Sequence, residues 1–337
     1  MAALLSTAGW ASAAQRVLGA SWIVTPGGLL TPEAARQQGT AAHLASDETP
    51  GWRRRIPTVA KTALKDVRQH RRARSFRVDP AGPWRGETLD FVWQRHELFH
   101  TAGADLATAL DAPLVVFAPA TAVWEAERWG VRRPGWGRWL ERTGESPTLR
   151  AASVVAAGGD EVAEQVIRLG VDPHRVVITP TGVDLDLFPT ELDRSLVRGR
   201  LGLGDELVVG WVGSFRGFHA IDALVDAMAG LDGVRLLLVG DGPERRPSEQ
   251  RAAERGVAVT ATGTVAHHDL PGHLAAMDVG VVMAPPDGAF HYSPLKLAEY
   301  LAAGLAVIAP RVPTVEDRVT DDVDALLVEP LMGNHNN

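Results

Sequence analysis

Residues 292–310 read Tyr-Ser-Pro-Leu-Lys-Leu-Ala-Glu-Tyr-Leu-Ala-Ala-Gly-Leu-Ala-Val-Ile-Ala-Pro. Ser293 is a suitable helix N-cap, and Pro294 suits the first helical position, where a missing N–H has no consequence. Gly304 favours the end of a helix, and the apolar run between it and Pro310 is typical of a short buried strand. The stretch therefore predicts a helix packed between two strands.

Lys296 and Glu299 lie three residues apart in this predicted helix, so both side chains project from the same face. The free N–H groups at the helix start carry partial positive charge and, together with Lys296, favour an anion. A carboxylate one turn further along suits a pair of sugar hydroxyls. The pattern predicts a site for the phosphate and ribose of a nucleotide. The alternative is a solvated Lys296–Glu299 ion pair on an ordinary capped helix.

Outward from this stretch, short apolar runs alternate with helical patterns. The expected strands are 89–93, 114–117, 153–157, 176–178, 207–212, 234–239, 257–260, 279–283 and 305–309. Alternating strands and helices imply parallel sheets, with ligands bound beyond the C-terminal ends of the strands. We predict an α/β fold of two Rossmann-like domains facing across a cleft. Residues 1–183 form the first, incomplete at its start, residues 184–330 form the second, and 331–337 are a polar tail.

Composition narrows the class of protein. The chain of 337 residues is long enough for two domains, and its net charge of −7 argues against nucleic acid as the main partner. The absence of cysteine excludes disulfides and thiolate metal sites. No apolar run reaches membrane-spanning length, and residues 1–24 predict a helix leading into a strand rather than a signal peptide. We expect a cytoplasmic protein, with residues 31–50 as a polar surface excursion and 187–205 as a linker.

Residues 51–85 are strongly basic and carry apolar residues at helical spacing, which predicts a basic amphipathic helix. One interpretation is that the apolar stripe packs on its own domain while the cationic face is simply solvated. The other is that residues 53–77 make a peripheral contact with an anionic membrane, at the inner membrane face, or with an anionic acceptor.

Four motifs together resemble a retaining-type GT-B glycosyltransferase close to family 4, of the branch with a Ser-Pro-Leu-Lys helix. They are Thr179-Pro-Thr-Gly-Val-Asp184, Gly210-Trp-Val-Gly-Ser-Phe-Arg216, Val239-Gly-Asp-Gly-Pro-Glu-Arg245 and Ser293-Pro-Leu-Lys-Leu-Ala-Glu-Tyr300. The resemblance covers the chain from about residue 89 to residue 330. It implies a first domain on the acceptor side and a second domain that binds a nucleotide-sugar.

The resemblance implies roles for residues of the donor helix. Glu299 corresponds to the glutamate that holds the nucleotide ribose, while His291 occupies the position of the family's other paired glutamate. Ser293, Pro294 and Leu295 form the helix start expected to meet the donor.

The residues that usually grip the diphosphate align with Ser214 and His219. Arg216 is two residues away and, together with Lys296, is expected to clamp the leaving diphosphate. Gly213 allows the backbone to approach the phosphate closely. The alternatives are a plain turn at Gly213 and a surface salt bridge for Arg216.

Three further elements follow from the resemblance. Residues Gly263, Thr264 and Val265 resemble the loop that meets the base through main-chain groups. His96 follows the strand expected at 89–93, and Glu125 follows the strand expected at 114–117. Both are candidate catalytic or acceptor-site residues, although a lone histidine after a strand is more often structural.

The resemblance implies transfer of a sugar from a UDP- or GDP-sugar to a hydroxyl acceptor, with retention, without a metal and without a cofactor other than the nucleotide-sugar substrate. Charge stabilisation at the departing diphosphate is expected to dominate. The alternatives are another GT-B enzyme, such as an inverting transferase or an epimerase, and a non-catalytic or truncated nucleotide-sugar binder.

Overall fold

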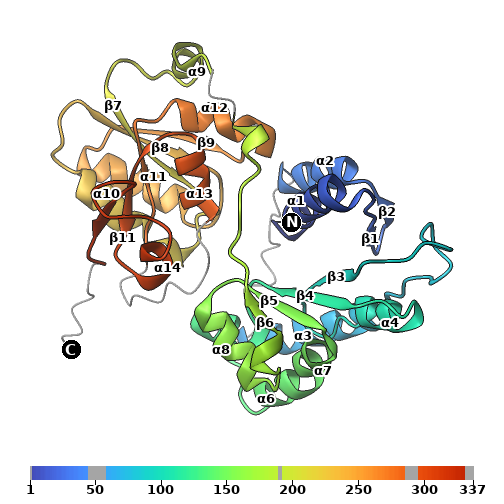
Figure 1. Cartoon of the computed structure of the whole chain (residues 1–337). Coiled ribbons are helices and arrows are strands. Elements are labelled where there is room, and N and C mark those ends of the chain that lie inside the picture. Colours follow the sequence, from blue (N-terminus) through green and yellow to red (C-terminus); the bar gives the residue numbers. More distant parts are fainter. Residues whose placement is uncertain (1, 45–57, 189–191, 285–294, 331–337) are drawn as a thin grey trace. The chain divides into compact units, whose positions relative to one another are not determined.

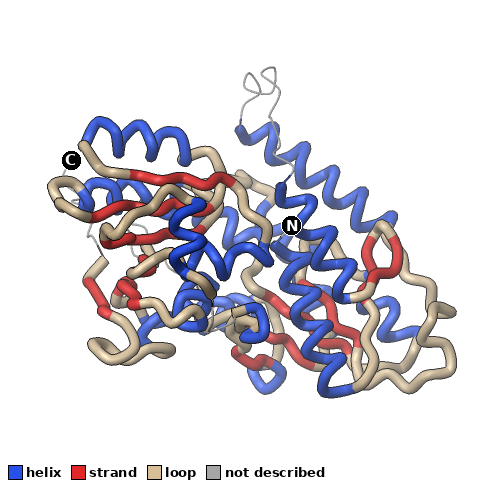
Figure 2. The backbone as a smooth tube through the Cα atoms, turned by 90° about the horizontal axis from the view of Figure 1, so that it is seen from above, coloured by secondary structure: helices blue, strands red, loops and turns tan. Residues whose placement is uncertain are grey.

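The computed structural model describes residues 2–44, 58–188, 192–284 and 295–330. They divide into two compact units, and the main change from one to the other falls between Pro180 and Thr181. Each unit contains its own parallel sheet with helices packed on it (Figures 1 and 2). The predicted α/β class with two Rossmann-like domains is confirmed.

The C-terminal unit has a six-stranded sheet in the order β12-β11-β10-β7-β8-β9, and every pairing in it is parallel. Its strands are β7 (Leu207–Val212), β8 (Val234–Val239), β9 (Val259–Gly263), β10 (Val279–Val281), β11 (Ala306–Pro310) and β12 (Leu326–Val328). The chain moves outward from β7 to β9 and then returns to the other side of β7 with β10. The order therefore reverses between β7 and β10, which is where α/β sheets bind ligands.

Helices cover both faces of this sheet (Figure 1). The helices of this unit are α9 (Arg194–Arg200), α10 (Ile221–Met228), α11 (Arg245–Arg255), α12 (Leu270–Ala275), α13 (Leu295–Ala302) and α14 (Pro313–Glu316). Trp211 of β7 packs in one core with residues of α10 and α11. On the other face, Gly210 and Gly280 leave space for the side chains of Met277 and Tyr300, which a Cβ would meet at 2.0 Å and 2.6 Å. These two glycines allow close packing against the sheet.

The N-terminal unit has a four-stranded parallel sheet in the simple order β3-β4-β5-β6. Its strands are β3 (Val92–Arg95), β4 (Leu114–Ala118), β5 (Val154–Ala157) and β6 (Val176–Ile178). The helices α4 (Ala102–Ala109), α7 (Ser146–Ala151) and α8 (Asp160–Arg168) contribute to the core on one face. On the other face, the ring of Trp10 lies 6.2 Å from that of Trp93 and 5.6 Å from that of Phe117. Unlike its counterpart, this order contains no reversal among the described strands.

The start of the chain forms α1 (Ala2–Leu18), which contains Trp10, and then a two-stranded hairpin of β1 (Ile23–Thr25) and β2 (Gly28–Leu30). The expected helix leading into a strand is confirmed. The expected surface excursion at 31–50 is wrong for its first part, which is α2 (Pro32–Leu44). Thr31 Oγ1 accepts a hydrogen bond from the N–H of Ala34 at 3.1 Å, so a cap starts this helix despite its polar composition.

The expected linker at 187–205 is also partly wrong, because it contains α9. The carboxylate of Asp193 caps that helix by accepting from the N–H of Leu196 at 3.0 Å. Polar composition alone does not separate a capped surface helix from a linker.

The basic segment forms α3 (Thr58–Ser75), which confirms the helix. The interpretation that its apolar stripe packs on the domain is wrong, because the buried residues are Thr62, Asp66 and Ala73. Arg133 and the indole of Trp136 hold the Asp66 carboxylate with three hydrogen bonds, at 2.9, 3.1 and 3.0 Å. A polar contact therefore sets which face is turned inward.

No helix in the described part of the chain has the length and apolarity needed to cross a bilayer.

Candidate functional site

The candidate site lies at the C-terminal ends of β7 and β10, where the strand order reverses. Helix α13 is anchored there by Tyr300, whose hydroxyl accepts a hydrogen bond from the N–H of Val212 at 2.9 Å. Val212 is the last residue of β7, so this bond joins the helix to the strand end. Tyr300 is fully buried, and burial raises its pKa above the ordinary value. The hydroxyl therefore stays neutral.

Lys296 is brought to the end of β7 by this anchor. Its Nζ lies 4.4 Å from the centroid of the Trp211 ring, a cation–π contact. Burial lowers the pKa of Lys296 to about 7, and the carboxylate of Glu299 opposes this shift. The surroundings of the amine thus disfavour its charged form, and a bound anion would offset that penalty by stabilising the positive charge.

Glu299 lies one turn further along α13 and is buried, with 6% of its surface exposed. Burial raises its pKa to about 7, and the charge of Lys296 opposes this. The basic side chain that faces it is His267, whose Nε2 lies 4.0 Å from Glu299 Oε1. That separation is longer than a hydrogen bond. The carboxylate therefore keeps acceptor capacity for other donors.

His219 is buried against Trp211, with ring centroids 5.3 Å apart at an interplanar angle of 65°. Burial, helped by the charges of Lys296 and Arg216, lowers the pKa of His219 to about 3. The imidazole is therefore neutral at physiological pH. Where the family pattern expects a cation, this chain has a neutral ring that can donate through one nitrogen.

The loop after β7 is held in an unusual backbone conformation. Phe215 and Ala220 have φ values of 42° and 50°, which non-glycine residues rarely adopt. The carbonyl of Phe215 accepts from the N–H of Glu244 at 2.9 Å. A Cβ at Gly242 would lie 2.0 Å from the carbonyl oxygen of Ser214, so the loops after β7 and β8 fit together only with glycine there. Ser214 and Arg216 are exposed on this loop.

Glycine is required at Gly213 and at Gly263 for different physical reasons. At Gly213 a Cβ would meet the Trp211 ring at 2.5 Å, so the absence of a side chain permits the ring's position. Gly263 has φ +71° with open space around it, so its backbone conformation is what requires glycine. Thr264 and Val265 follow it and are half-buried. Gly263 accepts from the N–H of Gly240 at 2.9 Å, which ties the loops after β8 and β9 together.

Three predicted site residues, His291, Ser293 and Pro294, lie outside the described residues. Leu295 begins α13 and is 39% exposed. The structure thus brings Gly213, His219, Lys296 and Glu299 to one end of the sheet.

In the N-terminal unit, His96 follows β3 and is fully buried. Its Nε2 lies 3.1 Å from Glu145 Oε1, and the same oxygen accepts from the N–H of Ala122 at 2.5 Å. Glu145 ends a short π-helix (Glu141–Glu145), and Ala122 begins α5 (Ala122–Arg128). His96 thus joins the end of β3 to two helices. Its predicted acceptor role stays a prediction.

Glu125 lies on α5, half-buried. Together with Glu97 it opposes the lowering of the Arg95 pKa by burial, so these groups share one electrostatic neighbourhood. His96 does not join them, because its ring is turned inward toward Glu145. The two candidate residues of this unit therefore lie in different surroundings.

Sequence reasoning missed two side chains of the candidate site. Trp211 contacts both Lys296 and His219, and it stands inside the motif quoted around Gly210. The position of this tryptophan near the end of a buried strand, just before a glycine-containing loop, is the sequence signal that could have indicated its place in the site. His267 faces Glu299 and follows the Gly263–Val265 loop at the end of a predicted strand, where ligand contacts are expected.

The described residues contain no cluster of three or more His, Asp or Glu side chains placed to hold a metal ion.

The sequence of the C-terminal unit is similar to that of a known protein family. Residues 206–333 match the family described as Glycosyl transferases group 1. D-inositol 3-phosphate glycosyltransferases of Mycobacterium bovis and Mycobacterium tuberculosis are 33% identical over 201 residues, which is 56% of this chain. The chain spans 40% of the length of these curated relatives.

Solved structures resemble the fold. HepE of Anabaena in complex with UDP matches with a TM-score of 0.56 and 19% identity, over 82% of this chain and 72% of that one. Sucrose-phosphate synthase of Thermosynechococcus elongatus matches with a TM-score of 0.55 and 24% identity, over 73% of this chain and 62% of that one. The C-terminal unit is therefore similar in sequence to the glycosyl transferases of group 1, and the chain has the two-sheet α/β fold of GT-B glycosyltransferases.

Proposed function

We propose that this chain is a glycosyltransferase that moves a sugar from a nucleotide-diphosphate donor to a hydroxyl acceptor. One observation carries the proposal: α13 is fixed to the end of β7 so that Lys296 and Glu299 lie together at the reversal of the strand order. A cation for the diphosphate and a buried carboxylate for the ribose hydroxyls are the two groups that a nucleotide-sugar needs.

In the proposed reaction, the bond between the sugar C1 and the donor phosphate oxygen breaks, and the acceptor oxygen bonds to C1. The acceptor proton leaves with the diphosphate. Lys296 and Arg216 would stabilise the charge that develops on the leaving group, with His219 as a neutral donor beside them. We propose retention, with neither a metal nor a further cofactor. NMR of the anomeric proton in the product would test the stereochemistry, and assays in EDTA would test the metal requirement.

UDP-sugars are the first donors to test. The structures of HepE that resemble this fold contain UDP, or UDP with glucose. The curated relatives are named D-inositol 3-phosphate glycosyltransferases, so inositol phosphates are suitable first acceptors to test. GDP-sugars form the second donor panel. For the N-terminal unit, Glu125 and His96 stay the predicted acceptor-side residues.

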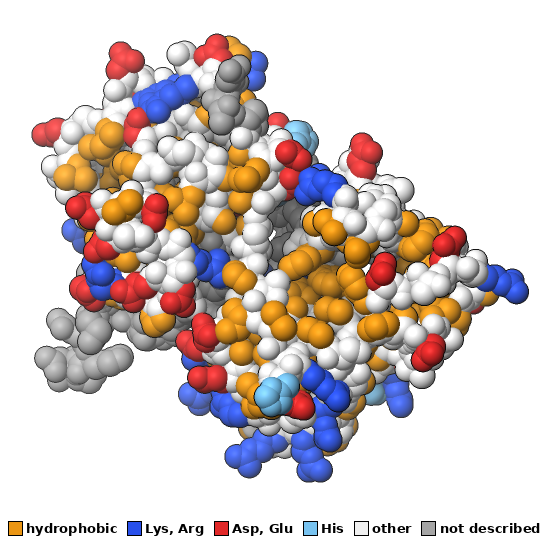
Figure 3. Space-filling view, viewed as in Figure 1, with side chains coloured by type: hydrophobic (Ala, Val, Ile, Leu, Met, Phe, Trp, Pro, Cys, Tyr) orange, Lys and Arg blue, Asp and Glu red, His pale blue; other side chains and the backbone are white. Residues whose placement is uncertain are grey.

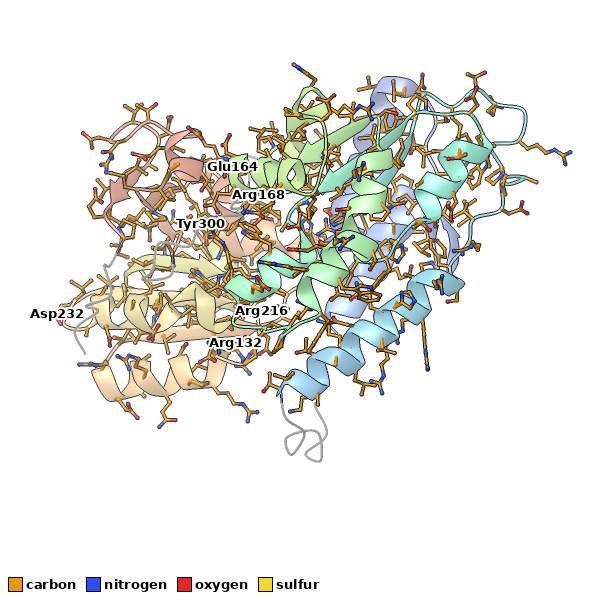
Figure 4. All side chains as sticks on the ribbon, turned by 90° about the horizontal axis from the view of Figure 1, so that it is seen from below. Arg132, Glu164, Arg168, Arg216, Asp232 and Tyr300 are labelled. Atoms are coloured by element: carbon orange, nitrogen blue, oxygen red, sulfur yellow. The ribbon has the colours of Figure 1, made fainter. Side chains whose placement is uncertain are left out.

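The test is release of UDP or GDP from nucleotide-sugars, with and without acceptor, combined with saturation-transfer NMR for binding. Glu299→Gln should abolish detectable donor binding, because the replaced group can no longer accept two strong hydrogen bonds. Glu164→Gln is the matched control, since Glu164 is exposed on α8 in the other unit (Figure 4). Unchanged donor binding by Glu299→Gln would remove the site assignment. Binding without transfer across the donor and acceptor panels would instead indicate a nucleotide-sugar binder.

A further inference from the structure

The outward face of α3 combines apolar and cationic side chains. The buried residues of this helix, Thr62, Asp66 and Ala73, share its inward side. Leu64 and Val67 lie on the opposite side, one turn apart, and are 46% and 49% exposed. With the exposed Ala60 they form a narrow stripe at a spacing of four and three residues. Packing within the unit therefore does not account for this stripe.

Cations border the stripe. The exposed basic residues of α3 are Lys61, Lys65, Arg68, Arg71, Arg72 and Arg74. Within the described part of the chain, none of these six takes part in an ion pair. The single acidic residue of the helix, Asp66, is turned inward and is held by Arg133. The face is thus strongly cationic on a chain whose net charge is −7.

An exposed tryptophan is connected to the helix through the buried ring of Phe99. The ring of Phe99 is 4.4 Å from that of His70 on α3 and 6.1 Å from that of Trp139. Trp139 stands on α6 (Gly137–Leu140) and is 55% exposed. Tryptophan is favoured at the boundary between lipid headgroups and acyl chains. Figure 4 shows α3 along the outside of its unit with side chains projecting away, and basic side chains also gather at the lower edge of this unit in Figure 3.

We propose that the outward face of α3 docks on an anionic lipid bilayer. Leu64 and Val67 enter the boundary of the acyl chains, and the flanking lysines and arginines bind the acidic headgroups. Charge complementarity selects anionic lipid, and the apolar stripe selects a bilayer over a nucleic acid, whose phosphate backbone gives such a stripe no partner. This proposal stands independently of the proposed function.

The test is co-sedimentation of the full chain with vesicles of phosphatidylcholine, with or without phosphatidylglycerol. We expect binding only when phosphatidylglycerol is present, and a decrease as salt is raised. Lys65→Gln with Arg68→Gln should weaken this binding, by about fivefold for each charge removed. Arg150→Gln with Arg200→Gln is the control, because it removes two exposed charges outside α3 and should leave binding unchanged.

A second variant tests the apolar stripe. Leu64→Ser with Val67→Ser should abolish the binding that persists at high salt, and circular dichroism should show a folded chain because both side chains are already exposed. Three results would overturn the proposal: no binding to phosphatidylglycerol vesicles, equal loss in the two charge variants, or wild-type behaviour of the serine variant. Preferential binding of a duplex RNA oligonucleotide in place of vesicles would also overturn it.

Discussion

The two units both bury ionisable side chains, but they differ in how these groups are satisfied. In the N-terminal unit, Asp66 receives three hydrogen bonds from Arg133 and Trp136. In the C-terminal unit, Lys296 lies over an aromatic ring, and Glu299 has His267 only at 4.0 Å. A buried carboxylate that accepts three hydrogen bonds specifies one packing arrangement, whereas a buried carboxylate whose nearest basic partner stands 4.0 Å away favours a ligand that completes it. The number of hydrogen bonds that the carboxylate accepts, more than its burial, therefore distinguishes Asp66 from Glu299.

The largest expected effect is on stability. Asp66→Ala leaves the Arg133 guanidinium buried without its partner and should lower the free energy of unfolding by about 3–5 kcal/mol. Urea denaturation followed by circular dichroism measures this. Replacing both partners, as Asp66→Leu with Arg133→Met, should recover much of the loss. If Asp66→Ala instead weakened donor binding and left the free energy of unfolding unchanged, the contrast between a structural Asp66 and a ligand-binding Glu299 would be wrong.

A loss of affinity is expected from Lys296→Met. Methionine keeps much of the apolar stem but removes the charge, so affinity for UDP should fall by about 10- to 100-fold. Isothermal titration calorimetry measures it. Because the lysine is held where its charge is disfavoured, the melting temperature should not fall. A lower melting temperature with unchanged affinity would assign Lys296 to packing, as for Asp66.

His96→Asn sharpens the comparison within the N-terminal unit. Since His96 and Glu145 are both fully buried, losing the contact should lower the free energy of unfolding by about 1–3 kcal/mol. Denaturation and steady-state kinetics should be measured on the same samples. A fall in turnover without a change in stability would instead support the acceptor-side role predicted for His96.

The smallest expected effect is a pH dependence of UDP binding. The pKa of Lys296 is lowered to about 7, so its attraction for the diphosphate is present below that pH and is lost as pH rises through it. The pKa of Glu299 is raised to about 7, so its carboxylate form is lost as pH falls. Affinity should therefore be greatest near pH 7 and fall by up to about tenfold per pH unit on either side. Lys296→Met should remove the fall in affinity above pH 7. If the variant lost affinity above pH 7 as the wild type does, the alkaline effect would not come from Lys296.

Much of the fold could be predicted because the relevant signals are local. Strands β7 and β8 begin and end where their apolar runs do. The helices α2 and α9 were missed because their caps, Thr31 and Asp193, lie within polar stretches whose composition resembles a linker. The mistaken inward face of α3 has a non-local cause, because Asp66 is buried only when Arg133, far along the chain, reaches it.

For the candidate site, residue identity and spacing were sufficient to select Lys296 and Glu299, because residues three apart share a helix face. Trp211 and His267 were not selected, because their roles depend on which loops meet at the end of the sheet. The neutrality of His219 also could not be predicted from sequence, because burial and two neighbouring cations determine its pKa together.

By itself, the sequence determined the alternation of strands and helices, the glycine loops at strand ends and the pairing of a lysine with a glutamate on one helix face. These depend on periodicity and backbone conformation, which act over a few residues. Only the tertiary structure decided which carboxylates are saturated and which stay available, and which side of α3 faces outward. Those outcomes depend on contacts between residues far apart in the chain, and burial acts on a charge only after those contacts have formed.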